Sequence, residues 1–410
     1  GVLLIDNAHG NQVKGNYIGV GADGASPIPN QQGVHILGGQ DNTVGGAIAG
    51  EGNVISGNTF NGILVYGNPG AESTNNRIIG NLIGTNRTGT SAVPNSSGVS
   101  IAQNTRGNIV GGTTPAEHNL ISGNTNEGVS FYLGASANSV HGNYIGINAA
   151  GNSALGNSIG VHIHAAFSNT VGGPSAAHRN VVSGNRRQGI LIENIPASGP
   201  GNIVQGNYVG TDVSGTKALG NTTQFSGSAI ALSEASHNAI IGNVVCAGTG
   251  SEIGLVGQST QFNDVQGNYV GLNAAGSDTL GNWYGIYLNR GASENLVGGP
   301  LPADRNVVSG NIRLGVVLDS LTHNNRILGN YIGTDKNGSA PLGNGRGSSQ
   351  GAAILIHQSY SNSIGDVTPG SGNIICASVG RGLAADTAAA PSSSSMAGTP
   401  AIAPKPYLRA

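Results

Sequence analysis

The pentapeptide GNYIG at residues 15–19 sets the architecture of this chain, because it recurs along almost the whole sequence. Identical or closely similar pentapeptides begin at Gly80, Gly142, Gly206, Gly267 and Gly329. Successive copies are 65, 62, 64, 61 and 62 residues apart. A fixed period of this kind marks a protein built from equivalent units, each of which buries its apolar face only by stacking on its neighbours. The sequence therefore predicts a solenoid.

Each period contains two coils, and each coil contains three short apolar stretches. The first stretch of most coils is a glycine followed by alternating apolar residues, as in GILV from Gly62 and GVHI from Gly160. The other two stretches are exemplified by NTVGG from Asn42 and NVISGN from Asn53. Short runs rich in Val and Ile between Gly and Asn indicate β-strands, and no segment sustains the 3.6-residue period of a helix. We expect three strands per coil and almost no helix.

Such strands have no hairpin signal between them, so each is expected to pair with its equivalent in the next coil. Parallel crossovers are almost always right-handed. The predicted fold is an all-β, single-stranded, right-handed parallel β-helix, with roughly twelve coils that rise about 4.8 Å each. We place the β-helix at residues 1–383 and a Pro/Ala/Ser-rich C-terminal tail at residues 384–410.

Asparagine recurs at equivalent corners, where it tolerates turn conformations and can hydrogen-bond to the same residue of another coil. Two structural columns are predicted. The first contains Asn53, Asn119, Asn180, Asn243, Asn306 and Asn373. The second contains Asn16, Asn81, Asn143, Asn207, Asn268 and Asn330.

Composition narrows the class of protein. The chain has 71 glycines, 9% charged residues and a net charge of −2, which argues against nucleic acid as a partner and against an anionic membrane surface. No apolar run is long enough for membrane insertion. Cys246 and Cys376 occupy equivalent positions four coils apart, about 19 Å, so no disulfide between them is expected. The low charge and the Gly/Asn/Ser/Thr content favour an extracellular or cell-surface protein, and a start inside a repeat suggests a processed or truncated product.

The repeat motifs resemble those of a large group of secreted bacterial right-handed parallel β-helix proteins, whose units read NTVGG, RNVISGN, GNYIGTD and LGN. The matching words lie at Val171 to Gly173, Arg179 to Asn185, Gly206 to Asp212 and Leu219 to Asn221. The resemblance implies the fold. It leaves the function open, because similar proteins include polysaccharide lyases, hydrolases and epimerases as well as adhesins and matrix proteins.

In polysaccharide-acting proteins of this fold, the substrate lies along outward residues of one strand column, so we aligned those residues of the first strand. One column contains His35, Leu64, Ser100, Ser130, His162, Leu191, Ala231, Tyr287, Val317 and Leu355. The other contains Tyr66, Ala102, Tyr132, His164, Glu193, Ser233, Asn289, Asp319 and His357.

The strongest candidate cluster spans three consecutive coils. Its members are Tyr132, His162, His164 and Glu193, with Glu127, Arg186 and Arg187 at the preceding corners. For β-elimination on a uronate, Arg186 or Arg187 would neutralise the sugar carboxylate, His164 or Tyr132 would take the α-proton, and Glu193 would orient the histidine. The alternative is a polar, solvent-facing strand surface with no catalytic role.

Two other chemistries are less favoured. A glycosidase needs two carboxyl groups flanking the bond, and no paired carboxylates stand in one column. His162 and His164 lie two residues apart on one face and would hold Zn²⁺ or Cu²⁺ only with a third ligand such as Glu193. We therefore expect no metal and no cofactor.

The leading functional hypothesis is an extracellular structural protein that self-associates into a fibre, matrix or surface layer. A parallel solenoid presents open strand edges at its ends, which favours other copies of the same chain as partners, joined end to end or through the tail. The alternative is a carbohydrate-active enzyme or glycan-binding β-helix, most plausibly a lyase acting on a uronate-containing polysaccharide.

Overall fold

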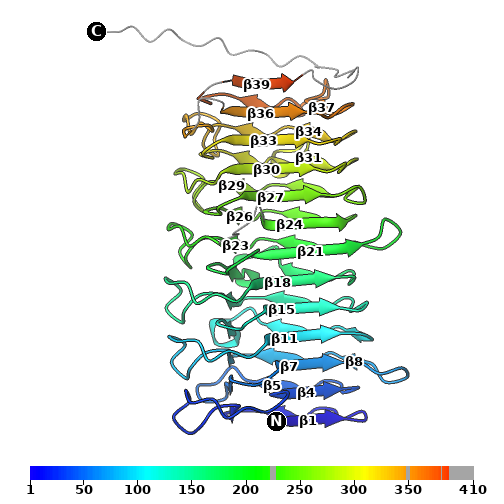
Figure 1. Ribbon diagram of the computed structural model, residues 1–410, viewed down its shortest axis with the longest axis vertical. Coiled ribbons are helices and arrows are strands. Elements are labelled where there is room, and N and C mark those ends of the chain that lie inside the picture. Colours follow the sequence, from blue (N-terminus) through cyan, green and yellow to red (C-terminus); the bar gives the residue numbers. More distant parts are fainter. Residues whose placement is uncertain (222–227, 348–350, 380, 387–410) are drawn as a thin grey trace.

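The computed structural model describes residues 1–221, 228–347, 351–379 and 381–386, which form one elongated stack of coils with the N-terminus at one end (Figure 1). Three parallel sheets run along the stack. In Figure 1 the strands of the sheet nearest the viewer run from left to right while the chain climbs, so the winding is right-handed. The predicted right-handed parallel β-helix is confirmed.

The first sheet has 13 strands and carries the candidate cluster. Its strands are β1 (Val2–Ile5), β4 (Val34–Leu37), β7 (Asn61–Tyr66), β11 (Ser97–Ala102), β15 (Glu127–Tyr132), β18 (Ile159–His164), β21 (Ile190–Ile195), β24 (Ser228–Ala235), β27 (Ser251–Val256), β30 (Tyr284–Asn289), β33 (Leu314–Asp319), β36 (Ala352–His357) and β39 (Arg381–Asp386). Strand β39 extends the β-helix three residues beyond the predicted boundary at residue 383. The rest of the predicted tail, residues 387–410, lies outside the described residues.

The second and third sheets have 12 strands each, most of them only two or three residues long. The second sheet contains β2 (Gln12–Val13), β5 (Thr43–Gly45), β9 (Arg77–Ile79), β13 (Ile109–Gly111), β16 (Ser139–His141), β19 (Thr170–Gly172), β22 (Ile203–Gln205), β25 (Ala239–Ile241), β28 (Asp264–Gln266), β31 (Leu296–Gly298), β34 (Arg326–Leu328) and β37 (Ser363–Ile364). The third contains β3 (Tyr17–Ile18), β6 (Val54–Ile55), β10 (Leu82–Ile83), β14 (Leu120–Ile121), β17 (Tyr144–Ile145), β20 (Val181–Val182), β23 (Tyr208–Val209), β26 (Val244–Val245), β29 (Tyr269–Val270), β32 (Val307–Val308), β35 (Tyr331–Ile332) and β38 (Ile374–Ile375).

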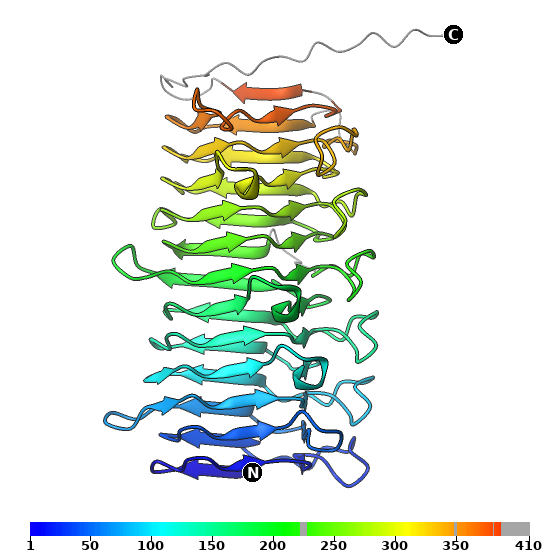
Figure 2. The same ribbon diagram turned by 180° about the vertical axis from the view of Figure 1, so that it is seen from behind.

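Short elements mark some of the corners between sheets, as the rear view shows (Figure 2). The strands β8 (Ser73–Thr74) and β12 (Thr105–Arg106) pair with each other. Within the described ranges the helical segments are three 3₁₀ turns of three residues, η1 (Pro115–Glu117), η2 (Ala176–His178) and η3 (Pro302–Asp304). The expectation of almost no helix is therefore confirmed for these residues. None of the described helices has the length and apolar character needed to cross a bilayer.

Alternation along each strand separates the core from the surface. In β4, Val34 and Ile36 are fully buried and His35 between them is partly exposed, and Ile63 and Val65 of β7 repeat this pattern one coil later. Most of the buried apolar residues belong to one cluster that runs from Val13 to Ile354. Each such aliphatic side chain contributes roughly 1.5–3 kcal/mol on burial, so apolar stacking along the axis stabilises the fold.

The glycine that begins most strands of the first sheet is required by close packing between coils. A Cβ added at Gly98 would lie 2.5 Å from the carbonyl oxygen of Gly128 and 2.7 Å from Ile121. Such distances leave no room for a side chain. Glu252 of β27 is an exception, because it stands at this position between Ala229 and Gly285 in the register.

The two predicted asparagine columns are a single ladder, which corrects the prediction that they are separate. Asn16 Nδ2 donates to Asn53 Oδ1 at 2.9 Å, and Asn53 Nδ2 donates to Asn81 Oδ1 at 2.9 Å. The same amide bonds alternate between the two predicted sets up to Asn373. The prediction compared residues that are two coils apart, so it divided the alternate asparagines of this one ladder between two columns. Asn119 and Asn180 lie on the same side, as predicted, each bonded to Asn143.

Two further asparagine ladders were not predicted. One contains Asn11, Asn42, Asn76, Asn108, Asn138, Asn169, Asn202, Asn238, Asn263, Asn295, Asn325 and Asn362. The other runs through Asn30, Asn58, Asn95, Asn124, Asn157, Asn185 and Asn221, then resumes at Asn282, Asn311 and Asn344.

The interruption in this last ladder falls at Gly248, which has no side chain to offer. The carboxyl group of Glu252 lies there instead, and its Oε1 accepts a hydrogen bond from the Gly248 backbone N–H at 2.8 Å. Asn282 Oδ1 accepts from the same N–H at 3.0 Å.

The predicted register holds for the cysteines. Cys246 and Cys376 follow β26 and β38, which are four strands apart in the third sheet, and both are free thiols.

Candidate functional site

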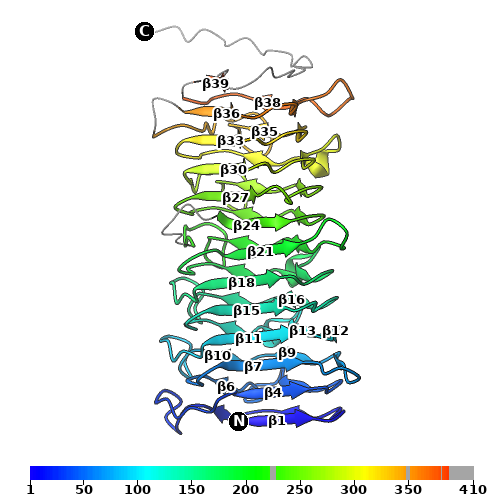
Figure 3. The ribbon, with the colours of Figure 1, turned by 45° about the vertical axis from the view of Figure 1, so that its right-hand side comes forward.

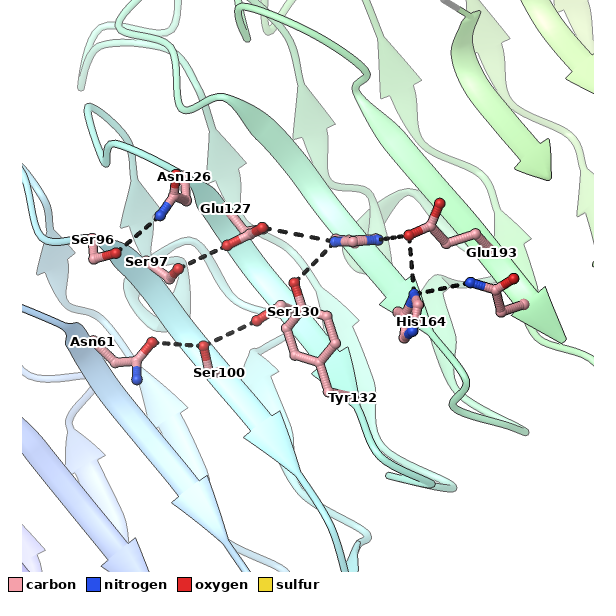
Figure 4. A network of polar contacts seen from close by, with 12 residues as sticks. Asn61, Ser96, Ser97, Ser100, Asn126, Glu127, Ser130, Tyr132, His164 and Glu193 are labelled. Atoms are coloured by element: carbon pink, nitrogen blue, oxygen red, sulfur yellow. Dashed lines mark hydrogen bonds and ion pairs between the residues drawn. The ribbon is translucent and has the colours of Figure 1, made fainter. Parts of the chain in front are cut away.

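The predicted cluster lies on the outer face of the first sheet, where β15, β18 and β21 stand side by side (Figures 3 and 4). Parallel register places His162 beside Ser130 and Leu191, and His164 beside Glu193. Tyr132 follows Phe131, which pairs with Ile163. Because alternate residues of a strand share a face, Tyr132, His162, His164 and Glu193 all project outward from three adjacent coils.

His162 connects the other members of the cluster. Its Nδ1 is hydrogen-bonded to the Tyr132 hydroxyl at 2.9 Å, and its Nε2 to Glu193 Oε1 at 3.0 Å. His164 Nδ1 reaches the same Glu193 oxygen at 3.0 Å. The rings of Tyr132 and His164 lie 6.0 Å apart between centroids. One carboxylate oxygen therefore holds both histidines, and one of these histidines holds the tyrosine.

Glu127 joins the cluster from the start of β15. Its Oε1 lies 3.8 Å from His162 Nδ1, and its Oε2 accepts a hydrogen bond from the Ser97 hydroxyl at 2.7 Å (Figure 4). The His162 side chain is 10% exposed, whereas that of His164 is 37% exposed. The cluster thus has a buried inner histidine and an accessible outer one.

The electrostatics of the site keep both carboxylates ionised and the tyrosine protonated. Burial would raise the pKa of Glu127, but hydrogen bonds from His162 and Ser97 outweigh it and lower this pKa to about 2. Burial would also raise the pKa of Glu193, but its hydrogen bond to His164 and the charge of His162 outweigh burial and lower this pKa. Burial, together with the charge of Glu127, raises the pKa of the Tyr132 hydroxyl. Neither Glu127 nor Glu193 is the protonated acid that a glycosidase requires.

The two arginines predicted for this site lie at the corner before β21. The Arg186 guanidinium donates to the carbonyl oxygens of Gly156 at 2.9 Å, Asn124 at 3.0 Å and Thr125 at 2.9 Å, so its charge satisfies backbone groups. Arg187 is exposed. It lies three residues before the start of β21. The structure therefore brings Tyr132, His162, His164, Glu193 and Glu127 together, and the guanidinium of Arg186 bonds to backbone groups outside that cluster.

A second cluster on the same face was not predicted as a site. Tyr287 of β30 donates its hydroxyl to Asp319 Oδ2 at 2.9 Å, and His357 Nδ1 lies 2.7 Å from Asp319 Oδ1. Asn289 donates to the Tyr287 hydroxyl at 3.0 Å. All four residues appear in the aligned outward columns, so grouping neighbours over three coils would have found them.

Comparisons with known proteins show distant likenesses to several solved structures. No family model and no curated protein matches the chain. Among solved structures, the A-module of a mannuronan C-5 epimerase from Azotobacter vinelandii has 14% identity and a TM-score of 0.37, covering 97% of this chain and 91% of that chain. A PL6 family polysaccharide lyase from Pseudopedobacter saltans has 12% identity and a TM-score of 0.39, covering 95% and 94%. The Dettilon tailspike protein has 13% identity and a TM-score of 0.33, covering 93% and 61%.

These likenesses are too distant to carry an argument about function. The resemblance of the repeat motifs to the secreted bacterial group stays a prediction. Any functional conclusion must come from the side chains of the site itself.

Proposed function

We propose that the protein acts on a uronate-containing polysaccharide that lies across the outer face of the first sheet, and that it cleaves the polymer by β-elimination. The observation that carries the proposal is the pairing of an exposed, oriented histidine with a neighbouring protonated tyrosine. His164 is the general base in this mechanism, and Tyr132 is the general acid.

The state of His164 follows from its partner. Glu193 is ionised and therefore only accepts hydrogen bonds, so the His164 proton lies on Nδ1, 3.0 Å from the carboxylate. The Nε2 atom then carries the lone pair. Because the side chain is 37% exposed, this lone pair is available to a bound sugar. A carboxylate that fixes the tautomer of a histidine in this way is the usual orientation of a general base.

The proposed step moves two protons and one electron pair. His164 Nε2 takes the proton from the sugar carbon next to the carboxylate, a C=C bond forms towards the neighbouring carbon, and the glycosidic C–O bond breaks. Tyr132 gives its hydroxyl proton to the leaving oxygen, for which its raised pKa keeps it protonated. Once the products leave, water carries a proton from the His164 imidazolium back to the Tyr132 phenolate.

The direct test is to incubate the protein with uronate polysaccharides and to follow the absorbance of the unsaturated product. His164→Ala should reduce turnover by about 10²–10⁴-fold, the usual contribution of a general base. His357→Ala is the matched control, because it removes a carboxylate-bound histidine from the same sheet. Equal losses in the two variants, or no unsaturated product from any uronate polymer, would refute the assignment.

Self-association into a fibre, matrix or surface layer, predicted from the repeat, remains a separate proposal. Sedimentation velocity over a range of protein concentrations would test it, because end-to-end assembly shifts the sedimentation coefficient with concentration. An extracellular or cell-surface location, also predicted from composition, is compatible with both proposals.

A further inference from the structure

We propose that His162, His164 and Glu193 form a binding site for a transition-metal ion of the Zn²⁺ type. The atoms that would ligate the ion are one nitrogen from each histidine and one oxygen from the carboxylate, and all three lie within 4.8 Å of one another. Two of the three separations are already 3.0 Å, from Glu193 Oε1 to His162 Nε2 and to His164 Nδ1. Small outward shifts of these side chains would admit an ion bound at about 2.0–2.2 Å.

The surroundings of His162 match those of a metal-binding histidine. Such residues commonly donate their second ring N–H to a polar or acidic group, which fixes the ring and raises its basicity. Here the second nitrogen, Nδ1, lies 2.9 Å from the Tyr132 hydroxyl and 3.8 Å from Glu127 Oε1. The ligands also project from two adjacent hydrogen-bonded strands, β18 and β21, so their backbone positions are fixed by the sheet.

The donor set decides the class of metal. Two imidazole nitrogens and one carboxylate oxygen suit Zn²⁺, Cu²⁺ or Ni²⁺, whereas Ca²⁺ and Mg²⁺ prefer sites made wholly of oxygen. The side chains of His164 and Glu193 are 37% and 29% exposed, so an ion can enter from solvent and a water molecule can complete its coordination.

Metal binding would block the proposed catalytic step, and this part of the inference rests on the proposed function. An ion on His164 Nδ1 moves the ring proton to Nε2, the atom that would take the proton from the sugar. An ion on Glu193 also removes the carboxylate that orients His164. The site would therefore make Zn²⁺ an inhibitor of the protein, and chelation would restore activity.

The decisive measurement is isothermal titration calorimetry of ZnCl₂ into full-length protein freed of metal with a chelator. We expect one ion per chain, and a loss of affinity of at least 100-fold in His164→Ala and in Glu193→Gln. Tyr132→Phe should weaken binding by about 10–100-fold, as loss of an outer-shell partner usually does. The visible spectrum of bound Co²⁺ should change in the same variants.

His357→Ala serves as the control, because the second cluster pairs its carboxylate with one histidine only. It should bind Zn²⁺ as the unmodified protein does. Absence of binding, or binding by His164→Ala and Glu193→Gln as tight as that of the unmodified protein, would overturn the metal site. The titration uses no polysaccharide, so it tests the metal site independently of the proposed function. If the protein binds Zn²⁺ but forms no unsaturated product, the metal site is supported and the proposed function is refuted.

Discussion

Two clusters on the outer face of the first sheet use the same residue types in different orders. The first, on β15, β18 and β21, and the second, on β30, β33 and β36, are three coils apart at their nearest strands, about 14 Å. In the first, Tyr132 bonds to a histidine and the carboxylate of Glu193 holds two histidines. In the second, the carboxylate of Asp319 holds the tyrosine and one histidine.

The difference shows that a regular scaffold places side chains, whereas their order along the columns decides the chemistry. The Tyr132 hydroxyl bonds to a ring nitrogen of His162 and lies next to an oriented base, His164. Asp319 instead accepts the Tyr287 proton directly, which ties up the group that would act as the acid. The first cluster is therefore suited to proton transfer or metal binding, and the second to stabilising the sheet.

The largest contrast is expected from removing the two tyrosine hydroxyls. Tyr132→Phe should lower turnover on a uronate polysaccharide by about 10²–10⁴-fold, because the leaving oxygen loses its proton donor. Tyr287→Phe should leave turnover unchanged. Initial rates of unsaturated-product formation measure both effects. A large loss of turnover in Tyr287→Phe would show that the first cluster is not the site of the chemistry.

The next largest effect is a pH dependence of stability, which arises from β27, a strand between the two clusters. Glu252 of β27 is fully buried, and burial raises its pKa to about 8 despite the hydrogen bond from Gly248. The folded protein thus retains a proton that the unfolded chain releases above its ordinary pKa of 4.5. The free energy of unfolding should fall as pH rises between these values, by at most about 1.4 kcal/mol per unit.

Glu252→Gln should remove this decline, so that the variant gains stability relative to the unmodified protein as the pH rises to 8. Urea unfolding at a series of pH values gives the two slopes. Parallel curves for the two proteins would show that the Glu252 carboxyl is not the group responsible.

A smaller effect of opposite sign is expected from Glu127 in the first cluster. Its pKa is lowered to about 2, with burial opposed by bonds from His162 and Ser97. The stabilisation is present above the ordinary pKa of 4.5 and is lost as pH falls towards 2, by up to about 3 kcal/mol. Glu127→Gln should flatten this acid limb in urea unfolding, and an unchanged limb would place the titrating group elsewhere.

The smallest expected effect is the loss of stability when the Tyr287 hydroxyl is removed. Tyr287→Phe should destabilise the protein by about 1–3 kcal/mol, because Asp319 loses a charge-assisted hydrogen bond. The urea midpoint reports the change. No shift of the midpoint would mean that the second cluster adds little to the stability of the sheet.

Most of the fold was predictable because each coil repeats the same pattern of apolar residues, glycine and asparagine. Alternation along each strand predicts the strands of the first sheet and the outward position of Tyr132, His162, His164 and Glu193. The period predicts the stacking of Asn119 and Asn180. The merging of the two asparagine columns was missed, since the 63-residue period conceals the equivalence of its two coils. The contact of Glu252 with Gly248 depends on a gap in an asparagine ladder, which only the folded structure shows.

The contacts within the site were less predictable. Arg186 lies one corner from the cluster in sequence, yet its guanidinium donates to three carbonyl oxygens of the two preceding coils. The Tyr132 hydroxyl bonds diagonally to His162 rather than to His164, its neighbour across the strand.

Repetition and alternation in the chain are enough to specify the coils, their stacking and the outward columns, because one register of the parallel sheets places the alternate Val and Ile side chains of successive coils in a common core. The pairing of polar groups within those columns emerges only in the assembled molecule. Long side chains from strands about 4.8 Å apart reach several partners, and burial and charge in three dimensions select among them.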